Sequence, residues 1–192
     1  MLPVIIGIVV VIVIACAIAG IYNNMVTKRN RIDNAWQNID TQLQRRNDLI
    51  PNLVATVKGY ADFEQKTLTD VVEARAKATQ ITVDPSQLTP AALEQFQSAQ
   101  GELSQALGRL MVVAERYPDL KANQNFLELQ SQLEGTENRI SVARQRFNQA
   151  ASAYNAYILK FPSNLIAGMF GFDRATLFQA DESAQEAPKV EF

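Results

Sequence analysis

The chain has 192 residues, a net charge of −2, one Cys and no His. This near-neutral charge gives no sign of a nucleic-acid-binding protein, and a single Cys excludes a disulfide framework or a Cys-based metal site. The lack of His excludes an imidazole base, a phosphorylated His and a His metal ligand.

A charge-free apolar run from Leu2 to Tyr22 begins the chain. At the helical rise of about 1.5 Å per residue it spans about 30 Å, the thickness of a bilayer's hydrocarbon core. We therefore predict a transmembrane anchor over residues 1–25, in contact with membrane lipid. Ala17-Ile18-Ala19 resembles a signal-peptidase site and Cys16 lies in a loose lipoprotein box. No basic segment precedes the run, so we expect the span to be retained.

The charges that follow the span predict its orientation. Lys28, Arg29 and Arg31 come before the first acidic residue, Asp33. Because positive residues next to a span stay on the cytoplasmic side, we expect the N-terminus outside and the soluble domain in the cytoplasm.

Residues 26–161 carry the apolar periodicity of long helices packed at coiled-coil-like spacing. The first helix is expected over residues 26–78, with polar interruptions in its apolar seam at Arg46, Glu64 and Thr67. Pro51 allows two outcomes, a kinked continuous helix or a reversal of the chain. The seam crosses Pro51 without a phase shift, which favours the kinked helix.

Two later helices are expected after the break between Ile81 and Pro90. The first covers about residues 91–116; a turn at Tyr117-Pro118-Asp119 separates it from the second, over about 120–160. The predicted fold is therefore all-α, a single transmembrane helix continuing into an elongated antiparallel helical bundle. Residues 162–178 form an apolar segment that either folds back on the bundle or exposes a patch. Residues 179–192 form an acidic tail that we expect to be disordered.

The two later helices are too short to cover a continuous helix over residues 26–78 along its full length. The apolar seam nearest the membrane should then be uncovered and should find a second copy of the chain. We therefore predict a parallel homo-oligomer whose self-association residues are Ile32, Trp36, Ile39 and Leu43.

Polar side chains on the helices predict a network that fixes how the helices align. Its expected members are Arg45, Asn52, Glu134, Glu137, Asn138 and Arg144. The alternative is that the Asn and Arg residues line a ligand groove. Glu64, Glu134 and Glu137 could hold metals across facing helices, but such sites also use His. We therefore predict no metal, no cofactor and no catalytic residues.

The residues between positions 165 and 172 predict a patch that binds unidentified membrane or cytoplasmic proteins. Its members are Leu165, Ile166, Met169, Phe170 and Phe172.

Several motifs together resemble the LemA family. They lie at Ala35–Asp40, Arg45–Leu53, Glu115–Asn123 and Glu134–Ile140. The resemblance extends from the anchor to about Phe178. It implies a bacterial inner-membrane protein with one N-terminal span, an elongated helical domain, and a link to membrane quality control or envelope stress.

The sequence thus predicts a membrane-anchored, non-enzymatic scaffold or adaptor that self-associates. Two alternatives remain at this stage: a polymer that remodels membranes, and an enzyme that uses metal-bound carboxylates.

Overall fold

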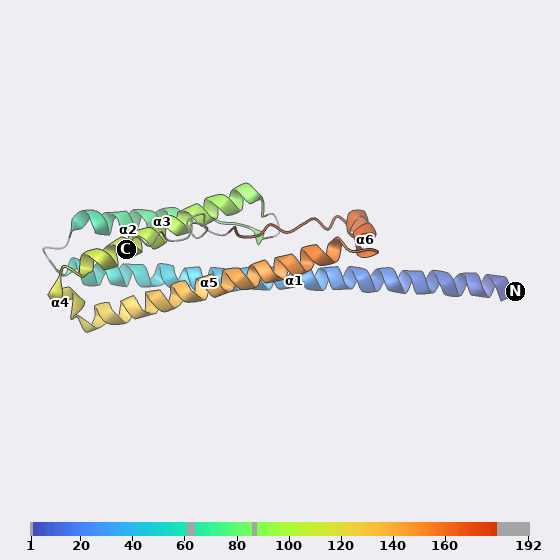
Figure 1. The fold of residues 1–192 in the computed structure, drawn as a ribbon, viewed down its shortest axis with the longest axis horizontal. Coiled ribbons are helices and arrows are strands. Elements are labelled where there is room, and N and C mark those ends of the chain that lie inside the picture. The colour runs from blue at the N-terminus through green and yellow to red at the C-terminus, as the bar shows by residue number, and fades with distance from the viewer. Residues whose placement is uncertain (1, 61–63, 86–87, 180–192) are drawn as a thin grey trace, which may run out of the picture.

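The computed structural model describes residues 2–60, 64–85 and 88–179. In these ranges the elements are α1 (Leu2–Lys58), α2 (Gln65–Gln80), α3 (Pro90–Ala114), α4 (Pro118–Lys121), α5 (Gln124–Ile158) and α6 (Ser163–Phe170). The predicted fold class, a long apolar N-terminal helix that continues into a helical bundle, is confirmed (Figure 1).

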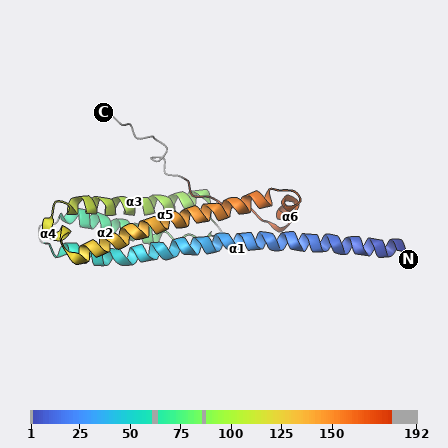
Figure 2. The same cartoon turned by 60° about the horizontal axis from the view of Figure 1, so that its bottom comes forward.

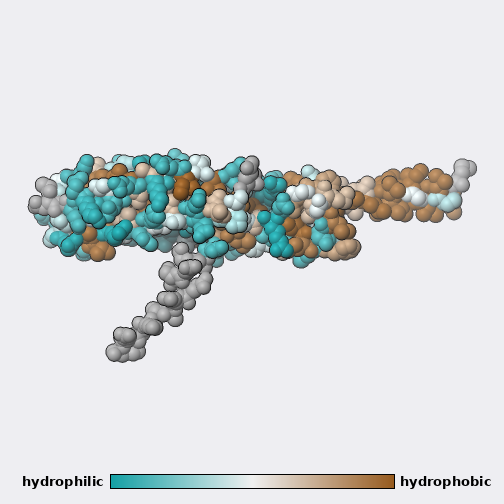
Figure 3. Space-filling model, turned by 90° about the horizontal axis from the view of Figure 1, so that it is seen from above, coloured by the Kyte–Doolittle hydropathy of each residue, from teal (hydrophilic) through white to brown (hydrophobic). Residues whose placement is uncertain are grey.

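The N-terminal part of α1 projects from the bundle with no other element beside it (Figures 1 and 2). Its side chains are apolar and exposed from Leu2 to Ile14. α1 is long and apolar enough to cross a membrane. In Figure 3 this projecting end is hydrophobic, whereas the surface of the bundle is mostly hydrophilic.

The bundle consists of two antiparallel helix pairs. α5 lies along α1, and α3 lies along α2, so that the chain runs up, down, up and down through the four long helices (Figures 1 and 2). The 3.6-residue periodicity of each helix places its apolar stripe inward.

Two apolar clusters fill the bundle. The cluster nearer the anchor is centred on Trp36, whose ring lies 5.4 Å from that of Phe96 and 5.7 Å from that of Phe147. Phe178, from the end of the described chain, stacks on Trp36 at 6.0 Å. The far cluster contains Leu53, Val57 and residues of α2, α3 and α5.

α1 continues through Pro51, as the unshifted seam predicted. A Pro inside a helix has no N–H for the carbonyl four residues earlier, which here is that of Asn47. The Arg75 Nε of α2 donates a hydrogen bond to this Asn47 oxygen at 3.0 Å. A side chain from the neighbouring helix therefore replaces the missing backbone donor.

The expected continuous helix over residues 26–78 is wrong, because α1 ends at Lys58 and α2 runs back antiparallel to it. After Lys58 the backbone tightens, because the Gly59 N–H donates to the Thr56 carbonyl at 3.3 Å and the Tyr60 N–H to the Val57 carbonyl at 3.1 Å. Tyr60 is fixed by the turn between α3 and α5: its hydroxyl accepts from Asn123 Nδ2 at 2.9 Å and donates to the Asp119 carbonyl at 3.4 Å.

The expectation that the seam near the membrane is uncovered is also wrong. Ile32, Trp36, Ile39 and Leu43 are all buried against residues of the same chain. The length mismatch behind that expectation disappears once α1 ends at Lys58. Residues 26–58 and the 35-residue α5 each measure about 50 Å. One chain therefore covers this seam by itself, so the seam no longer indicates an oligomer. Self-association stays a prediction.

The remaining helices differ from expectation mainly at their ends. α3 begins at Pro90, with Thr89 as its cap: the Ala92 N–H donates to Thr89 Oγ1 at 3.2 Å. The expected helix over 120–160 is divided into α4 and α5. The cap of α5 is Asn123, whose side-chain Oδ1 accepts from the Phe126 N–H at 3.1 Å.

Residues after α5 form α6 and then an extended segment that returns along the bundle. Asn155 and Asn148 of α5 each exchange two hydrogen bonds with this segment, at Ala175 and Phe178 respectively. These contacts place Phe178 on Trp36. Of the predicted disordered tail, residues 180–192 lie outside the described part of the chain.

Candidate functional site

A buried arginine joins three helices in the middle of the bundle. Arg46 of α1 is 1% exposed, and its Nη1 contacts Glu137 of α5 at 2.7 Å. The same nitrogen donates to Ser104 at 3.0 Å, and Nη2 donates to Gln100, both on α3. A buried cation with three acceptors satisfies the rule that buried charges are paired and hydrogen-bonded. This cluster fixes the alignment of α1, α3 and α5.

The structure places the residues of the predicted polar network in different surroundings. Glu137 belongs to the Arg46 cluster, whereas Arg45 and Asn52 are exposed on α1. Glu134 accepts from Gln130 on its own helix. The Arg144 guanidinium lies over the Phe178 ring at 5.5 Å. Asn138 is exposed at the edge of a groove.

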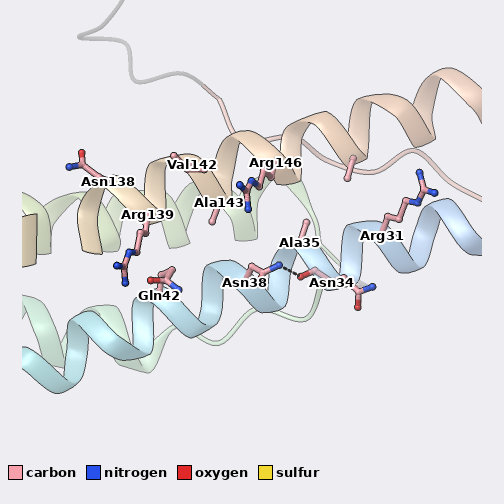
Figure 4. Close-up of a pocket in the computed structure, with 11 residues that line it drawn as sticks. Arg31, Asn34, Ala35, Asn38, Gln42, Asn138, Arg139, Val142, Ala143 and Arg146 are labelled. Carbon is pink, nitrogen blue, oxygen red and sulfur yellow. Dashed lines mark hydrogen bonds between the residues drawn. The ribbon is translucent and has the colours of Figure 1, made fainter. Parts of the chain in front are cut away.

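That groove runs between α1 and α5, has a volume of about 530 Å³, and is the candidate functional site (Figure 4). From α1 it is lined by Arg31, Asn34, Ala35, Asn38 and Gln42, and from α5 by Asn138, Arg139, Val142, Ala143, Arg146 and Ala150. Each helix contributes one stripe, because residues three or four apart share a helix face. The Asn38 side chain donates to the Asn34 carbonyl at 3.0 Å.

The groove is electropositive. Arg139 and Arg146 point from α5 toward α1, and Arg31 points from α1 toward α5 (Figure 4). Its lining contains no Asp or Glu, and none of the ion pairs found among the described residues uses these three arginines. Guanidinium groups bind carboxylates and phosphates in a bidentate manner, so the arrangement suits an anionic ligand.

The residues of the predicted partner-binding patch lie on opposite sides of α6. Ile166 packs inward, while Leu165, Met169 and Phe170 are exposed. Phe172 is half-buried beside the ring of Tyr22. The extended segment behind α6 is held by Tyr154, whose hydroxyl donates to the Asp173 carbonyl at 3.0 Å. Burial raises the pKa of this phenol, which keeps it a neutral donor.

The carboxylates considered as metal ligands have separate partners. Glu64 accepts from Arg116 at 3.4 Å, Glu137 pairs with Arg46, and Glu134 accepts from Gln130. Over residues 2–60, 64–85 and 88–179, no group of three or more Cys, Asp or Glu side chains is placed to hold a metal ion.

Sequence reasoning missed the two most informative features. It placed Arg45 rather than Arg46 in the network, although Arg46 was recognised as a polar interruption of the seam. It also assigned none of the three groove arginines to a binding site, since Arg31 was considered only for the orientation of the span. Their signal was a polar stripe beside the seam: Arg31, Asn34 and Asn38 on α1 lie at steps of three and four residues.

Comparison with known proteins gives consistent matches. A model of the LemA family matches residues 35–192. The magnetosome protein MamQ 2 of Paramagnetospirillum magneticum is 30% identical over 190 residues, which covers 88% of this chain and 68% of that protein. The LemA protein of Metamycoplasma hominis is 28% identical over 163 residues, covering 85% of this chain and 71% of that protein. The matched region includes α2 to α6 and most of the part of α1 that lies in the bundle.

Proposed function

The chain belongs to the LemA family, and on that premise we propose that it is a membrane-anchored, non-enzymatic scaffold of the bacterial inner membrane. Its bundle faces the cytoplasm, because Lys28, Arg29 and Arg31 follow the span. The link to membrane quality control or envelope stress that the family resemblance implies is part of this proposal.

The observation that carries the scaffold proposal is the arginine-lined groove between α1 and α5. Arg31, Arg139 and Arg146 bring three positive charges to one surface without an acidic neighbour in its lining. Like charges held together on a surface favour binding of an opposite charge, and they steer its approach. The groove therefore binds an acidic segment of a partner protein.

The continuity of α1 supports this role. One unbroken helix includes both the span and one wall of the groove. Arg31 lies nine residues beyond Tyr22, about 14 Å along the helix axis. A partner bound in the groove is consequently held close to the membrane surface.

Photo-crosslinking in living cells tests the groove. A photo-reactive amino acid at Val142, which lines the groove, should give discrete adducts with another protein. The same amino acid at Val112, an exposed residue of α3 outside this groove, is the matched control. Adducts of equal yield at both positions would contradict the proposal.

Charge reversal separates an electrostatic site from simple proximity. Arg139→Glu should abolish the Val142 adducts, whereas Arg45→Glu, an exposed arginine of α1 outside the groove, should leave them intact. If the adducts contain only two copies of this chain, the groove binds a second copy, as in the predicted homo-oligomer, and not an acidic partner protein. Persistence of the adducts after Arg139→Glu would rule out recognition through charge.

A further inference from the structure

α6 exposes large apolar side chains on the face turned away from the bundle. Met169 is 77% exposed and Leu165 59% exposed, and they lie four residues apart on one side of the helix. Phe170 adds to the same surface, and Phe161, just before α6, is 80% exposed. The opposite face of α6 is also apolar, because Ile166 and Ala167 pack into the cluster that contains Met25. α6 therefore has little polar surface for water.

The position of α6 coincides with the end of the membrane span. The Phe170 ring lies 5.1 Å from the ring of Tyr22, and the Phe172 ring lies 5.5 Å from it. Tyr22 is the last residue of the apolar run that begins at Leu2, and tyrosines are enriched at the level where helices leave the hydrocarbon core. Figure 1 shows α6 at the end of the bundle from which α1 projects.

α6 is held firmly in this position. Gly171 ends the helix in the left-handed conformation, at φ 69°, and the Phe172 N–H donates to the Ala167 carbonyl at 3.0 Å. This is the usual geometry of a glycine stop. The following segment is tied to α5 at Asp173 and Ala175. The apolar face is thus presented by a fixed element.

Positive charges lie next to this apolar face. Lys160 stands between the exposed side chains of Leu159 and Phe161. The Lys28 ammonium, six residues after Tyr22, lies 5.2 Å from the centre of the Tyr157 ring. Apolar side chains flanked by lysines suit the boundary between acyl chains and anionic headgroups. Asp173, an acidic residue that follows Phe172, is directly followed in the sequence by Arg174.

We propose that α6, together with Leu159 and Phe161, is a second membrane contact that lies in the headgroup region of the bilayer beside the span. The occupant of the exposed face is therefore lipid rather than a protein partner. Two contacts fix the tilt and rotation of the bundle relative to the membrane, which a single helix leaves free. The inference rests on the proposed anchoring of α1 and is independent of the arginine groove.

A fluorescent label on single cysteines of the full chain tests this inference. In a Cys16→Ala background, Met169→Cys carries an environment-sensitive fluorophore, and the protein is reconstituted in nanodiscs that contain anionic lipid. Ile8→Cys, in the span, is the lipid-exposed reference, and Val112→Cys is the water-exposed reference. We expect a blue-shifted emission for Met169→Cys and quenching by lipids that carry a doxyl group near the headgroup. Ile8→Cys should be quenched more strongly by a doxyl group near the end of the acyl chain.

The inference is overturned if the label at Met169 emits and is quenched like the label at Val112. It is equally overturned if that label is water-exposed in nanodiscs but shielded in native membranes, since a protein then covers the face. Failure of the anchoring proposal is distinguishable, because the chain would not enter nanodiscs and Ile8→Cys would also report water.

Discussion

Arg46 shows how one buried charge selects the alignment of three helices. It lies in phase with Leu43, Ile50 and Leu53 on the inner face of α1, whereas Arg45 is rotated by about 100° toward solvent. An apolar residue at this position would tolerate α5 sliding by one turn. A guanidinium whose acceptors are Gln100, Ser104 and Glu137 does not, because sliding would leave it buried and unpaired.

Glu137→Ala should lower the free energy of unfolding by about 2 kcal/mol, because it leaves the buried Arg46 without its carboxylate. The value is below that of a fully buried pair, since the Glu137 side chain is 38% exposed. Glu134→Ala, three residues earlier on the outer surface, is the matched control and should change stability by less than about 0.5 kcal/mol. Urea unfolding of the full chain in detergent, followed by fluorescence of the lone Trp36, measures both.

A double-mutant cycle separates the ion pair from other effects of the substitution. In an Arg46→Met background the buried charge is gone. Glu137→Ala should then lower the free energy of unfolding by much less than it does in the natural chain. An equal cost in the two backgrounds would contradict the role given to the Arg46–Glu137 pair.

Among the elements, α1 shows why a long helix tolerates an internal proline. Pro51 is exposed on α1 and leaves the Asn47 carbonyl without a donor from its own helix. Arg75, half-buried on α2, supplies that donor at 3.0 Å. The missing N–H of Pro51 therefore links α1 to α2. The hydrogen bond from Arg75 to the Asn47 carbonyl aligns the two helices, and this carbonyl is open to it only because of the proline.

Arg75→Ala should destabilise the chain by about 1 kcal/mol, because the Asn47 carbonyl then loses its donor. Pro51→Ala should be stabilising, because residue 51 regains an N–H. In the Pro51→Ala background the cost of Arg75→Ala should shrink, since the helix itself now supplies the donor. Thermal unfolding of the four proteins by circular dichroism measures the coupling.

Arg45→Ala, an exposed arginine on α1, is the control for loss of a surface charge and should be nearly neutral. If Arg75→Ala lowers the stability equally with and without Pro51, Arg75 does not compensate for the proline.

At the scale of the whole molecule, the reversal after Lys58 decides which surfaces are covered. It makes the part of α1 in the bundle as long as α5, so that the seam beside the membrane meets Phe147, Ile140 and Phe96 of the same chain. The extended C-terminal segment completes the cover by placing Phe178 on Trp36 at 6.0 Å. Trp36 is consequently a core residue of one chain.

Trp36→Ala should therefore lower the stability of the fold without changing the number of chains in the particle. A loss of about 3–5 kcal/mol in the free energy of unfolding is expected for a buried aromatic residue. Circular dichroism gives the stability, and light scattering of the detergent-solubilised protein gives the particle mass. A smaller particle with unchanged stability would instead return Trp36 to an interface between chains.

The local features were predictable from the sequence. The long apolar N-terminal helix follows from a charge-free run of bilayer length, and the all-α class follows from the period of the apolar residues. The start of α3 follows from Thr89 and Pro90, which form a helix cap. The predicted polar network named Glu137 but not Arg46, with which Glu137 pairs across the helices.

What the sequence by itself determined is therefore where helices can form and which of their faces are apolar, because both depend on neighbours within a few residues. Only the tertiary structure decided that α1 ends at Lys58, that Arg75 replaces a backbone donor, and that residues 171–178 cover Trp36. These features depend on contacts between residues far apart in the chain. The apolar stripe of one helix shows that this face must be covered, but it does not show which segment of the chain covers the face.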